Sequence, residues 1–394
     1  MRATLQVRLK DTFEFAALLC LIAIFAVASA TAQENAAGEE KYPQRNAAAP
    51  AVGPQTIRGT FTVAAGQSIQ AAVDRARPGD RIQVLPGTYH ETVTVDFDDI
   101  ELVGTLQNGE RPVLDGKNQM NDGVLASGNN FTISGFEIRN YKGNGVVVNK
   151  ANNATFRNLV CHNTGKYGIY PVLCNGVTAE SCVVSDVWDA GVYAGQCRDV
   201  VIQNCESYRN TIGIETENCI NVLMANNSAH NNSLGLLVVL LPDLPTTEAR
   251  NARVINNRVL DNNYPNLSPP NNTVNLVEPG LGIVVNAADN TEVTRNEVRG
   301  NNSYGIAMYA LTDVFPPEHK LNVEPNPDGN YIHGNRLQDN GAKVSKRMKD
   351  IGAPGGDLFW SGKGTGNGWN ETSDKTFPQK LPSWAGPAAA AGGR

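Results

Sequence analysis

The chain has 394 residues, with 33 Lys and Arg against 39 Asp and Glu and a net charge of −6. This sparse, slightly acidic charge disfavours a nucleic-acid-binding protein. Hydrophobic residues make up 41% of the chain, which excludes a disordered chain and allows a core. Gly and Asn are abundant, at 38 and 44 residues, and both favour tight turns. Many short strands are therefore expected, and long helices are not.

The first 32 residues have the pattern of a secretory signal peptide. Three basic residues near the start precede an apolar run over 15–28, and small residues of an A-x-A site end at Ala32. The run is too short to span a membrane. We therefore expect cleavage near Ala32, a periplasmic or secreted protein, and no membrane span in the mature chain. Residues 33–55 are predicted to be a flexible lead-in.

Glycines recur with a period of 22 or 23 residues along the middle of the chain. The clearest run is Gly123, Gly145, Gly168, Gly191, Gly213 and Gly235. Each precedes a short apolar alternation, and a second strand-like pattern follows in the same repeat. A fixed period of this length is typical of a solenoid. The leucine-rich repeat pattern is absent, which leaves an all-β, single-stranded parallel β-helix of roughly ten coils.

Residues 66–340 resemble the right-handed parallel β-helix repeat proteins, the pectin-lyase-like superfold with its NosD-like members. The resemblance lies in Ser68–Val73, Pro78–Val84 and Pro86–Glu91 at the entry to the repeats. The segment Asp357–Trp360 and the tail after it are similar to exported bacterial members without assigned activity. The resemblance implies a right-handed β-helix. It does not select one reaction, because this superfold carries lyases, hydrolases, epimerases and non-enzymes.

The β-helix is predicted over 56–342, with an N-terminal capping helix after Ser68 that covers the open edge of the first coil. Residues 343–394 are predicted to supply a closing strand and a tail. Insertions interrupt the period near 241–250, 264–280 and 309–329. Insertions on a solenoid gather on the face that binds.

Six cysteines follow the predicted cleavage site, in two registers of the repeat. The first set is Cys161, Cys182 and Cys205, and the second is Cys174, Cys197 and Cys219. Stacked strands lie about 4.8 Å apart, farther than the Cβ atoms of a disulfide. We therefore favour buried free thiols in two stacks over the disulfides that an exported chain would suggest.

Asparagines recur in the turns between the predicted strands. Asn153, Asn175 and Asn221 share one register with Asp199. Stacked amide side chains can hydrogen-bond from one layer to the next. These four residues are therefore predicted to form a ladder.

Alternation after the repeat glycines places two rows of side chains on the outer face of one sheet. The first row is Val147, Tyr170, Tyr193, Glu215, Leu237 and Val284, and the second is Asn149, Val172, Gly195, Glu217, Val239, Asn286 and Tyr309. Aromatic rings and carboxylates on one face are typical of a saccharide groove. The predicted substrate-binding residues are Lys166, Tyr170, Trp188, Asp189, Tyr193, Glu215 and Glu217. The plain alternative is a solvated outer face with no ligand.

The same face offers residues for several reactions. Glu215 and Glu217 would lie roughly 6.5–7 Å apart on one strand, a spacing within the range of an inverting glycosidase pair. A lyase or epimerase would instead need a base for a sugar proton. The candidate catalytic residues are Tyr170, Tyr193, Lys166, Arg209, Glu215 and Glu217.

Carboxylates on neighbouring coils are also weak candidates for a Ca²⁺ site. The residues concerned are Asp186, Asp189, Glu215 and Glu217. We expect no other cofactor, because the sequence has no further metal-ligand or nucleotide-binding motif.

The segment Thr164–Val172 is similar to the catalytic strand of mannuronan C5-epimerases, whose motif reads Tyr-Gly-Phe/Ile-Asp-Pro-His. Tyr170 stands at the Asp position and Val172 at the His position. Because both proton-transferring residues are missing, the epimerase activity is not carried over. The signature of polygalacturonases is absent as well.

Two functions follow from these observations. In the first, an exported β-helix protein binds an extended polysaccharide along one sheet face and processes it as a lyase, epimerase or glycosidase. In the second, a non-catalytic periplasmic scaffold docks an exported protein partner through its insertions. The sequence leaves the substrate, the metal dependence and the oligomeric state open.

Overall fold

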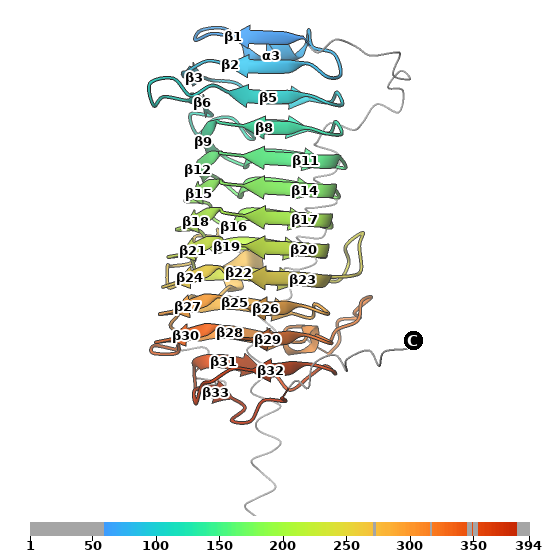
Figure 1. The fold of residues 1–394 in the computed structure, drawn as a ribbon, viewed down its shortest axis with the longest axis vertical. Helices are drawn as coiled ribbons and strands as arrows, with labels where there is room; N and C mark the ends of the chain where they lie inside the picture. Colours follow the sequence, from blue (N-terminus) through green and yellow to red (C-terminus); the bar gives the residue numbers. More distant parts are fainter. Residues whose placement is uncertain (1–58, 271–272, 316, 345–348, 350–353, 384–394) are drawn as a thin grey trace, which may run out of the picture.

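The computed structural model describes residues 59–383, apart from 271–272, 316, 345–348 and 350–353. The predicted signal peptide and lead-in therefore lie outside the described residues. Short parallel strands stack along one long axis and form three sheets of 12, 10 and 11 strands (Figure 1). From β2 (Arg81–Val84) to β31 (Gly356–Trp360) each successive coil adds one strand to each sheet, which confirms the predicted all-β, right-handed parallel β-helix.

Sheets A and B form two walls of the solenoid. Sheet A contains β1 (Thr60–Val63), β2 (Arg81–Val84), β5 (Glu101–Gly104), β8 (Thr132–Ser134), β11 (Asn152–Arg157), β14 (Asn175–Glu180), β17 (Arg198–Gln203), β20 (Ile220–Ala225), β23 (Arg250–Ile255), β26 (Glu292–Thr294), β29 (Tyr331–His333) and β32 (Gly368–Asn370). Sheet B contains β3 (Gly87–Tyr89), β6 (Pro112–Asp115), β9 (Glu137–Tyr141), β12 (Val160–Thr164), β15 (Val183–Ser185), β18 (Glu206–Tyr208), β21 (Ser228–His230), β24 (Arg258–Leu260), β27 (Glu297–Arg299) and β30 (Arg336–Gln338).

Sheet C is the third wall and carries the repeat glycines. It contains β4 (Val93–Val95), β7 (Val124–Ala126), β10 (Asn144–Asn149), β13 (Tyr167–Val172), β16 (Ala190–Gly195), β19 (Ile212–Glu217), β22 (Leu234–Val239), β25 (Leu281–Asn286), β28 (Tyr304–Tyr309), β31 (Gly356–Trp360) and β33 (Thr376–Phe377). Val146, Ile169, Val192 and Ile214 pair in register and are at most 1% exposed. Stacking one repeat on the next thus builds one continuous apolar core.

The first coil contains a short helix, α3 (Ile69–Val73), whose N-cap is Ser68. The Glu91 carboxylate accepts hydrogen bonds from the backbone N–H groups of Ile69 and Gln70. The Gln70 side chain bonds the backbone of Thr94 in β4, the terminal strand of sheet C. Sheet A ends instead at β1, so the helix alone does not cover the first coil.

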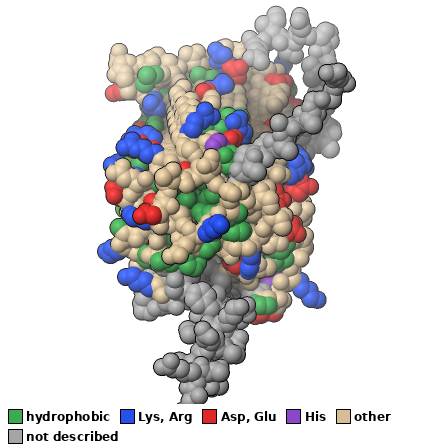
Figure 2. Space-filling model, turned by 60° about the horizontal axis from the view of Figure 1, so that its bottom comes forward, with side chains coloured by type: hydrophobic (Ala, Val, Ile, Leu, Met, Phe, Trp, Pro, Cys, Tyr) green, Lys and Arg blue, Asp and Glu red, His purple; other side chains and the backbone are tan. Residues whose placement is uncertain are grey.

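At the other end, β31 and β33 close sheet C, and the rings of Phe359 and Phe377 stack at 5.8 Å. Figure 2 turns this end toward the viewer and shows apolar side chains among charged ones. Among the helices of the described residues, none has the length and apolar character that a membrane crossing requires.

Long connections leave the coils at three places, between β22 and β23, β24 and β25, and β28 and β29. Two short 3-10 helices lie in them, η1 (Thr273–Leu276) and η2 (Leu311–Asp313). The first and third connections meet, because the N–H of Asp243 donates to Asn322 Oδ1 at 2.9 Å and its carboxylate lies 3.4 Å from His319. They therefore form one lobe at one corner of the solenoid.

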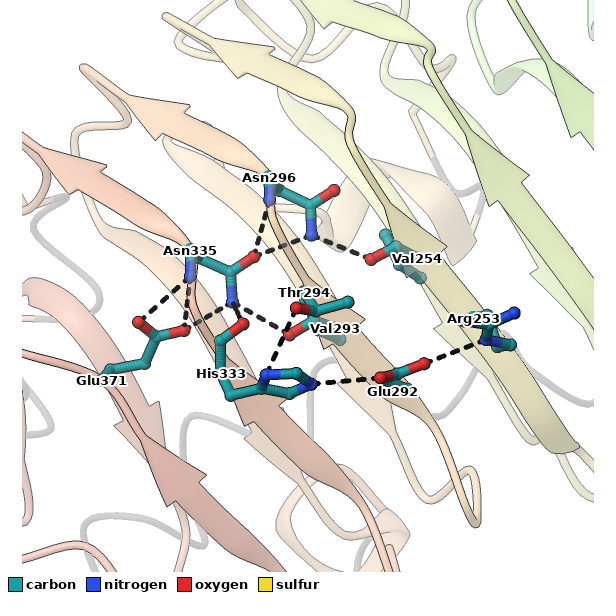
Figure 3. Close-up of polar contacts among 9 residues, drawn as sticks. All are labelled: Arg253, Val254, Glu292, Val293, Thr294, Asn296, His333, Asn335 and Glu371. Carbon is teal, nitrogen blue, oxygen red and sulfur yellow. Dashed lines mark hydrogen bonds and ion pairs between the residues drawn. The ribbon is translucent and has the colours of Figure 1, made fainter.

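Buried asparagines tie the coils together at the turn between sheets A and B. Asn227, Asn257, Asn296 and Asn335 each donate from backbone and side-chain N–H to the side-chain oxygen one coil further on. The row ends at Glu371, whose carboxylate accepts from Asn335 (Figure 3). Each buried amide is thereby satisfied, and the coil register is set by side chains as well as strands.

A second, exposed row follows the predicted asparagine ladder only in part. Asn153 donates to Asn130, and Asn221 donates to Asp199 at 2.9 Å. Asn175 does not belong to this row, because it pairs with Asn152. Gly176 stands over Asn153 instead. The prediction for Asn175 was wrong by one residue because the turn positions are not fixed by strand alternation.

All six cysteines of the β-helix are free thiols and buried, as predicted. Cys174, Cys197 and Cys219 form one stack, in which each Sγ accepts the backbone N–H of the cysteine before it. The other predicted stack is wrong in one member. Cys161 pairs with Val184 and not with Cys182, because their spacing of 21 residues falls short of the local repeat.

We predict that Asn296→Ala lowers the free energy of unfolding by about 1–3 kcal/mol, because it leaves the two donors of Asn257 without an acceptor. Arg253→Ala removes only the exposed ion pair with Glu292 and is the matched control, with a change within about 0.5 kcal/mol. Urea denaturation measures both. Equal effects of the two substitutions would contradict a structural role for the buried row.

We also predict that the six cysteines stay unmodified by an alkylating reagent in the native protein and react fully in urea. All six side chains are buried, which keeps the reagent away from them, and burial raises the pKa of Cys161 to about 12. Peptide mapping by mass spectrometry reads each thiol separately. Rapid native modification of Cys161 or Cys197 would show that the core opens locally.

Candidate functional site

The two predicted outward rows of sheet C exist, with the expected register. Val147 pairs with Tyr170, Tyr193 with Glu215, and Glu215 with Leu237. In the second row Val172 pairs with Gly195, and Gly195 with Glu217. Residues far apart in sequence are thus neighbours on one face.

The exposure of this face differs from the expectation of an open, solvated groove. Glu215 and Glu217 are only 6% and 7% exposed, and Asp189 is buried as well. The rows also carry apolar residues, which form a second hydrophobic cluster outside the sheet, and Val274 and Val277 of the second long connection pack against it. The carboxylates are therefore set in apolar surroundings, which strengthens electrostatic interactions there.

Three tyrosine rings of β13 and β16 lie together in this cluster. The ring centres of Tyr167 and Tyr193 are 4.6 Å apart and stacked, and Tyr170 meets Tyr193 edge-on at 5.2 Å. Lys166 Nζ lies 5.1 Å from the Tyr167 ring and 5.8 Å from the Trp188 ring. The structure thus brings the predicted residues Lys166, Tyr170, Trp188 and Tyr193 together.

Tyr167 is a member of the cluster that alternation did not predict. The next residue, Gly168, faces the core, where a Cβ would lie 2.3 Å from Val184 Cγ1. Ile169 also faces the core, so two consecutive residues point inward and Tyr167 is turned out. The regular glycine before each strand was the available signal for this break in alternation.

Glu217 is held by two donors. Tyr193 Oη donates to Glu217 Oε1 at 2.7 Å, and Gln196 Nε2 donates to the same oxygen at 2.9 Å. The Tyr193 ring crosses Gly195 to reach it, because a Cβ on Gly195 would lie 2.5 Å from Tyr193 Oη. Gln196 and Gly195 therefore position the acid, and neither role was predicted from the sequence.

The electrostatics of the pair follow from burial. Loss of water raises the pKa of Glu217 to about 7, while the Tyr193 hydrogen bond opposes that rise. Burial, then the charges of Asp189 and Glu217, hold the pKa of Glu215 well above its usual range. Lys166 favours the charged form of both. Burial also raises the pKa of Tyr193 and Tyr167.

Two predicted residues lie outside this cluster. Arg209 forms a two-pronged ion pair with Asp186, at 2.7 and 2.6 Å, and its guanidinium covers the Tyr208 ring. Both are therefore engaged with each other at the end of sheet B. Alternation could not show this, because they occupy a turn where Arg209 has a positive φ of 54°.

Comparison with known proteins agrees with the geometry of the fold. Residues 51–219 match the family model described as "Pel9A-like, right handed beta helix region". This chain is a right-handed parallel β-helix protein. No curated protein sequence matches it.

Solved structures resemble this β-helix at low sequence identity. The A-module of the Azotobacter vinelandii mannuronan C-5 epimerase AlgE6 has a TM-score of 0.56 and 18% identity, over 78% of this chain and 83% of that one. An alginate lyase from Paenibacillus sp. has a TM-score of 0.48 and 14% identity, over 78% and 99%. Pectate lyase Pel9A has a TM-score of 0.42 and 15% identity, over 86% and 83%. At such identities the likeness shows the fold alone.

The β-helix presents no ready metal centre in its described part. There, no group of three or more His, Cys, Asp or Glu is arranged to hold a metal ion. Asp186, one of the Ca²⁺ candidates, is occupied by Arg209. Binding of Ca²⁺ by Asp189, Glu215 and Glu217 stays a prediction.

We predict that Glu217→Gln changes how stability depends on pH. The pKa of Glu217 is higher in the folded protein than the ordinary 4.5, so its contribution to stability is present below about pH 4.5 and lost as pH rises to about 7. The loss approaches about 1.4 kcal/mol per pH unit for one such group. Glu217→Gln should flatten part of this decline in denaturation curves between these pH values.

The groups that face Glu217 are Asp189, Glu215, Lys166, Tyr193 and Gln196. The pKa of Glu215 is raised as well, so the stability of the Glu217→Gln variant should still decline with pH, but less steeply. Glu248→Gln is the control and should leave the slope unchanged, since that side chain is 52% exposed and its partner Arg250 is of a residue type that stays charged throughout this range. A wild-type profile that is flat from pH 4.5 to 7 would contradict the burial of a protonated acid.

Proposed function

We propose that this β-helix binds and processes an extended polysaccharide on the outer face of sheet C. The observation that carries the proposal is the cluster of three tyrosine rings with Glu215 and Glu217 on neighbouring strands. Sugar rings pack their apolar faces on aromatic rings, and carboxylates accept hydrogen bonds from sugar hydroxyls. Perturbed acids at such a place are typical of catalytic sites.

The geometry of the solenoid suits a long ligand. Successive strands of sheet C repeat about every 4.8 Å, close to the length of one sugar residue in an extended chain. A polysaccharide along the axis would therefore meet equivalent positions on each coil. The AlgE6 module is named as a mannuronan epimerase and has this fold. That likeness supports the proposal of a carbohydrate ligand.

The site is compatible with the lyase, epimerase and hydrolase chemistries considered above. Tyr170, Tyr193 and Lys166 could serve in proton transfer, and Glu215 with Glu217 could serve as an acid and a base. Arg209 is less suited, because Asp186 holds it away. We further propose export to the periplasm or outside the cell, on the strength of the predicted signal peptide.

The alternative is a scaffold that docks an exported protein. Its support is the lobe at one corner, where Asp243 and His319 join two insertions. A pull-down from envelope extract with and without residues 309–329 tests it. Loss of one partner on trimming, in a protein that binds no glycan, would favour the scaffold.

We predict that the purified protein binds at least one polysaccharide in an affinity-electrophoresis panel, run with Ca²⁺ and with a chelator. Tyr170→Ala should weaken binding about 10-fold, the loss of one aromatic contact. Tyr208→Ala on sheet B is the matched control and should bind as the wild type. Binding to no polysaccharide, or equal loss in both variants, would contradict the site on sheet C.

A further inference from the structure

Acids dominate the charge of the candidate site. Asp189, Glu215 and Glu217 are buried on one face, and Lys166 is the cation whose charge acts on both glutamates. The remaining candidate cation, Arg209, is held by Asp186. The other members of the two rows here are tyrosine, aliphatic and amide side chains.

These surroundings discriminate among polysaccharides. A polyuronate carries one carboxylate per sugar, and each would enter the same buried surroundings that already disfavour the charged form of Glu215 and Glu217. A neutral glycan brings hydroxyl groups, which donate to carboxylate and amide oxygens, and apolar ring faces, which pack on tyrosine. The face is therefore complementary to the second class.

We propose that this face takes a neutral, hydroxyl-rich polysaccharide and that Glu215 and Glu217 hydrolyse its glycosidic bonds, as acid and base respectively. The inference rests on the proposed function, since it assigns the substrate class and reaction of that same site. The proposed substrate is thus a neutral polymer and not a polyuronate such as the mannuronan named for the AlgE6 module.

Hydrogen bonding assigns the two roles. Glu217 accepts from Tyr193 and Gln196, which stabilise a carboxylate and fit it to be the base. Glu215 accepts no side-chain hydrogen bond from the described residues and faces Asp189 and Glu217, which favours its protonated form. Two carboxyl groups whose surroundings set their pKa values apart in this way can act as an acid and a base.

Asn149 supplies a second, independent sign of a ligand. It is 2% exposed, and its Oδ1 has no hydrogen-bond partner in the described part of the chain. It stands on the outward row of Glu217, separated from it only by Val172 and Gly195. Buried acceptors are normally satisfied, so this oxygen has the position and chemistry to accept a hydroxyl of a glycan a few sugars from the cleaved bond.

The reaction balances with one water. Glu215 gives its proton to the glycosidic oxygen as the bond from C1 to that oxygen breaks and its electron pair moves to the oxygen. Glu217 takes a proton from a water whose oxygen bonds to C1, and the proton returns to Glu215 through solvent. The Cα atoms of the pair, two apart on β19, are separated by about 6.6 Å, so both side chains leave the same face of the strand.

The test compares neutral with acidic polymers on the same protein. Xylan, galactan and mannan represent the neutral class, and polygalacturonate and alginate the uronate class. Binding is followed by affinity electrophoresis, hydrolysis by new reducing ends, and elimination by the ultraviolet absorbance of unsaturated products. We expect binding and new reducing ends with a neutral polymer, and no unsaturated product.

Variants separate the roles. Glu215→Gln and Glu217→Gln should each lower kcat about 100-fold or more while binding persists. Asn149→Ala should raise KM several-fold with kcat unchanged, the signature of a hydrogen bond made equally in ground and transition states. Glu206→Gln is the control with wild-type kinetics, and thermal melting verifies that every variant folds.

The outcomes distinguish this inference from the function on which it rests. Binding or cleavage of a uronate polymer would overturn the neutral substrate and leave the polysaccharide function standing. Binding of a neutral polymer without hydrolysis, or full activity in Glu215→Gln, would overturn the assigned reaction. Binding of none of the polymers would overturn both.

Discussion

The hydrogen-bonded register between successive coils is the constraint on which the rest of this structure depends. Parallel strands supply its backbone part, and rows of buried asparagine supply its side-chain part. A second row runs from Asn262 through Asn301 to Asn340, which donates to Asp357, so an acidic residue ends this row as Glu371 ends the first. Because a buried amide without a partner is unfavourable, a slip of one residue between neighbouring coils would be opposed at every layer. Positions one repeat apart therefore remain neighbours along the whole solenoid.

Register also explains how a cluster of acids can persist outside the core. Glu217 keeps its place because Tyr193 and Gln196 donate to it, and Tyr193 reaches it only because Gly195 has no side chain. Glu215 stands beside it next to Asp189, and none of the described side chains donates to it. Buried acids side by side oppose folding at neutral pH, so their retention beside three tyrosine rings favours a chemical role over a stabilising one.

Particular residues show how far prediction from sequence reached. The inward Val146, Ile169 and Val192 and the outward Tyr170 and Glu215 were placed correctly, since strand alternation and the glycine period determine them. Cys161 and Asn175 were misplaced, because turns vary by a residue while the strands stay in register. Arg209 and Asp186 were assigned to the wrong surface for the same reason.

The amino-acid sequence by itself determined the solenoid, its period and the sheet that carries the tyrosines and glutamates, because these depend on local alternation and on a repeat length visible in one dimension. Only the tertiary structure decided that Glu215 and Glu217 are set among apolar side chains, that Tyr167 joins them, and that Gln196 and Tyr193 hold Glu217. Burial and side-chain direction depend on what packs from other coils and connections. No single repeat contains that information, so it emerges only when the coils are stacked.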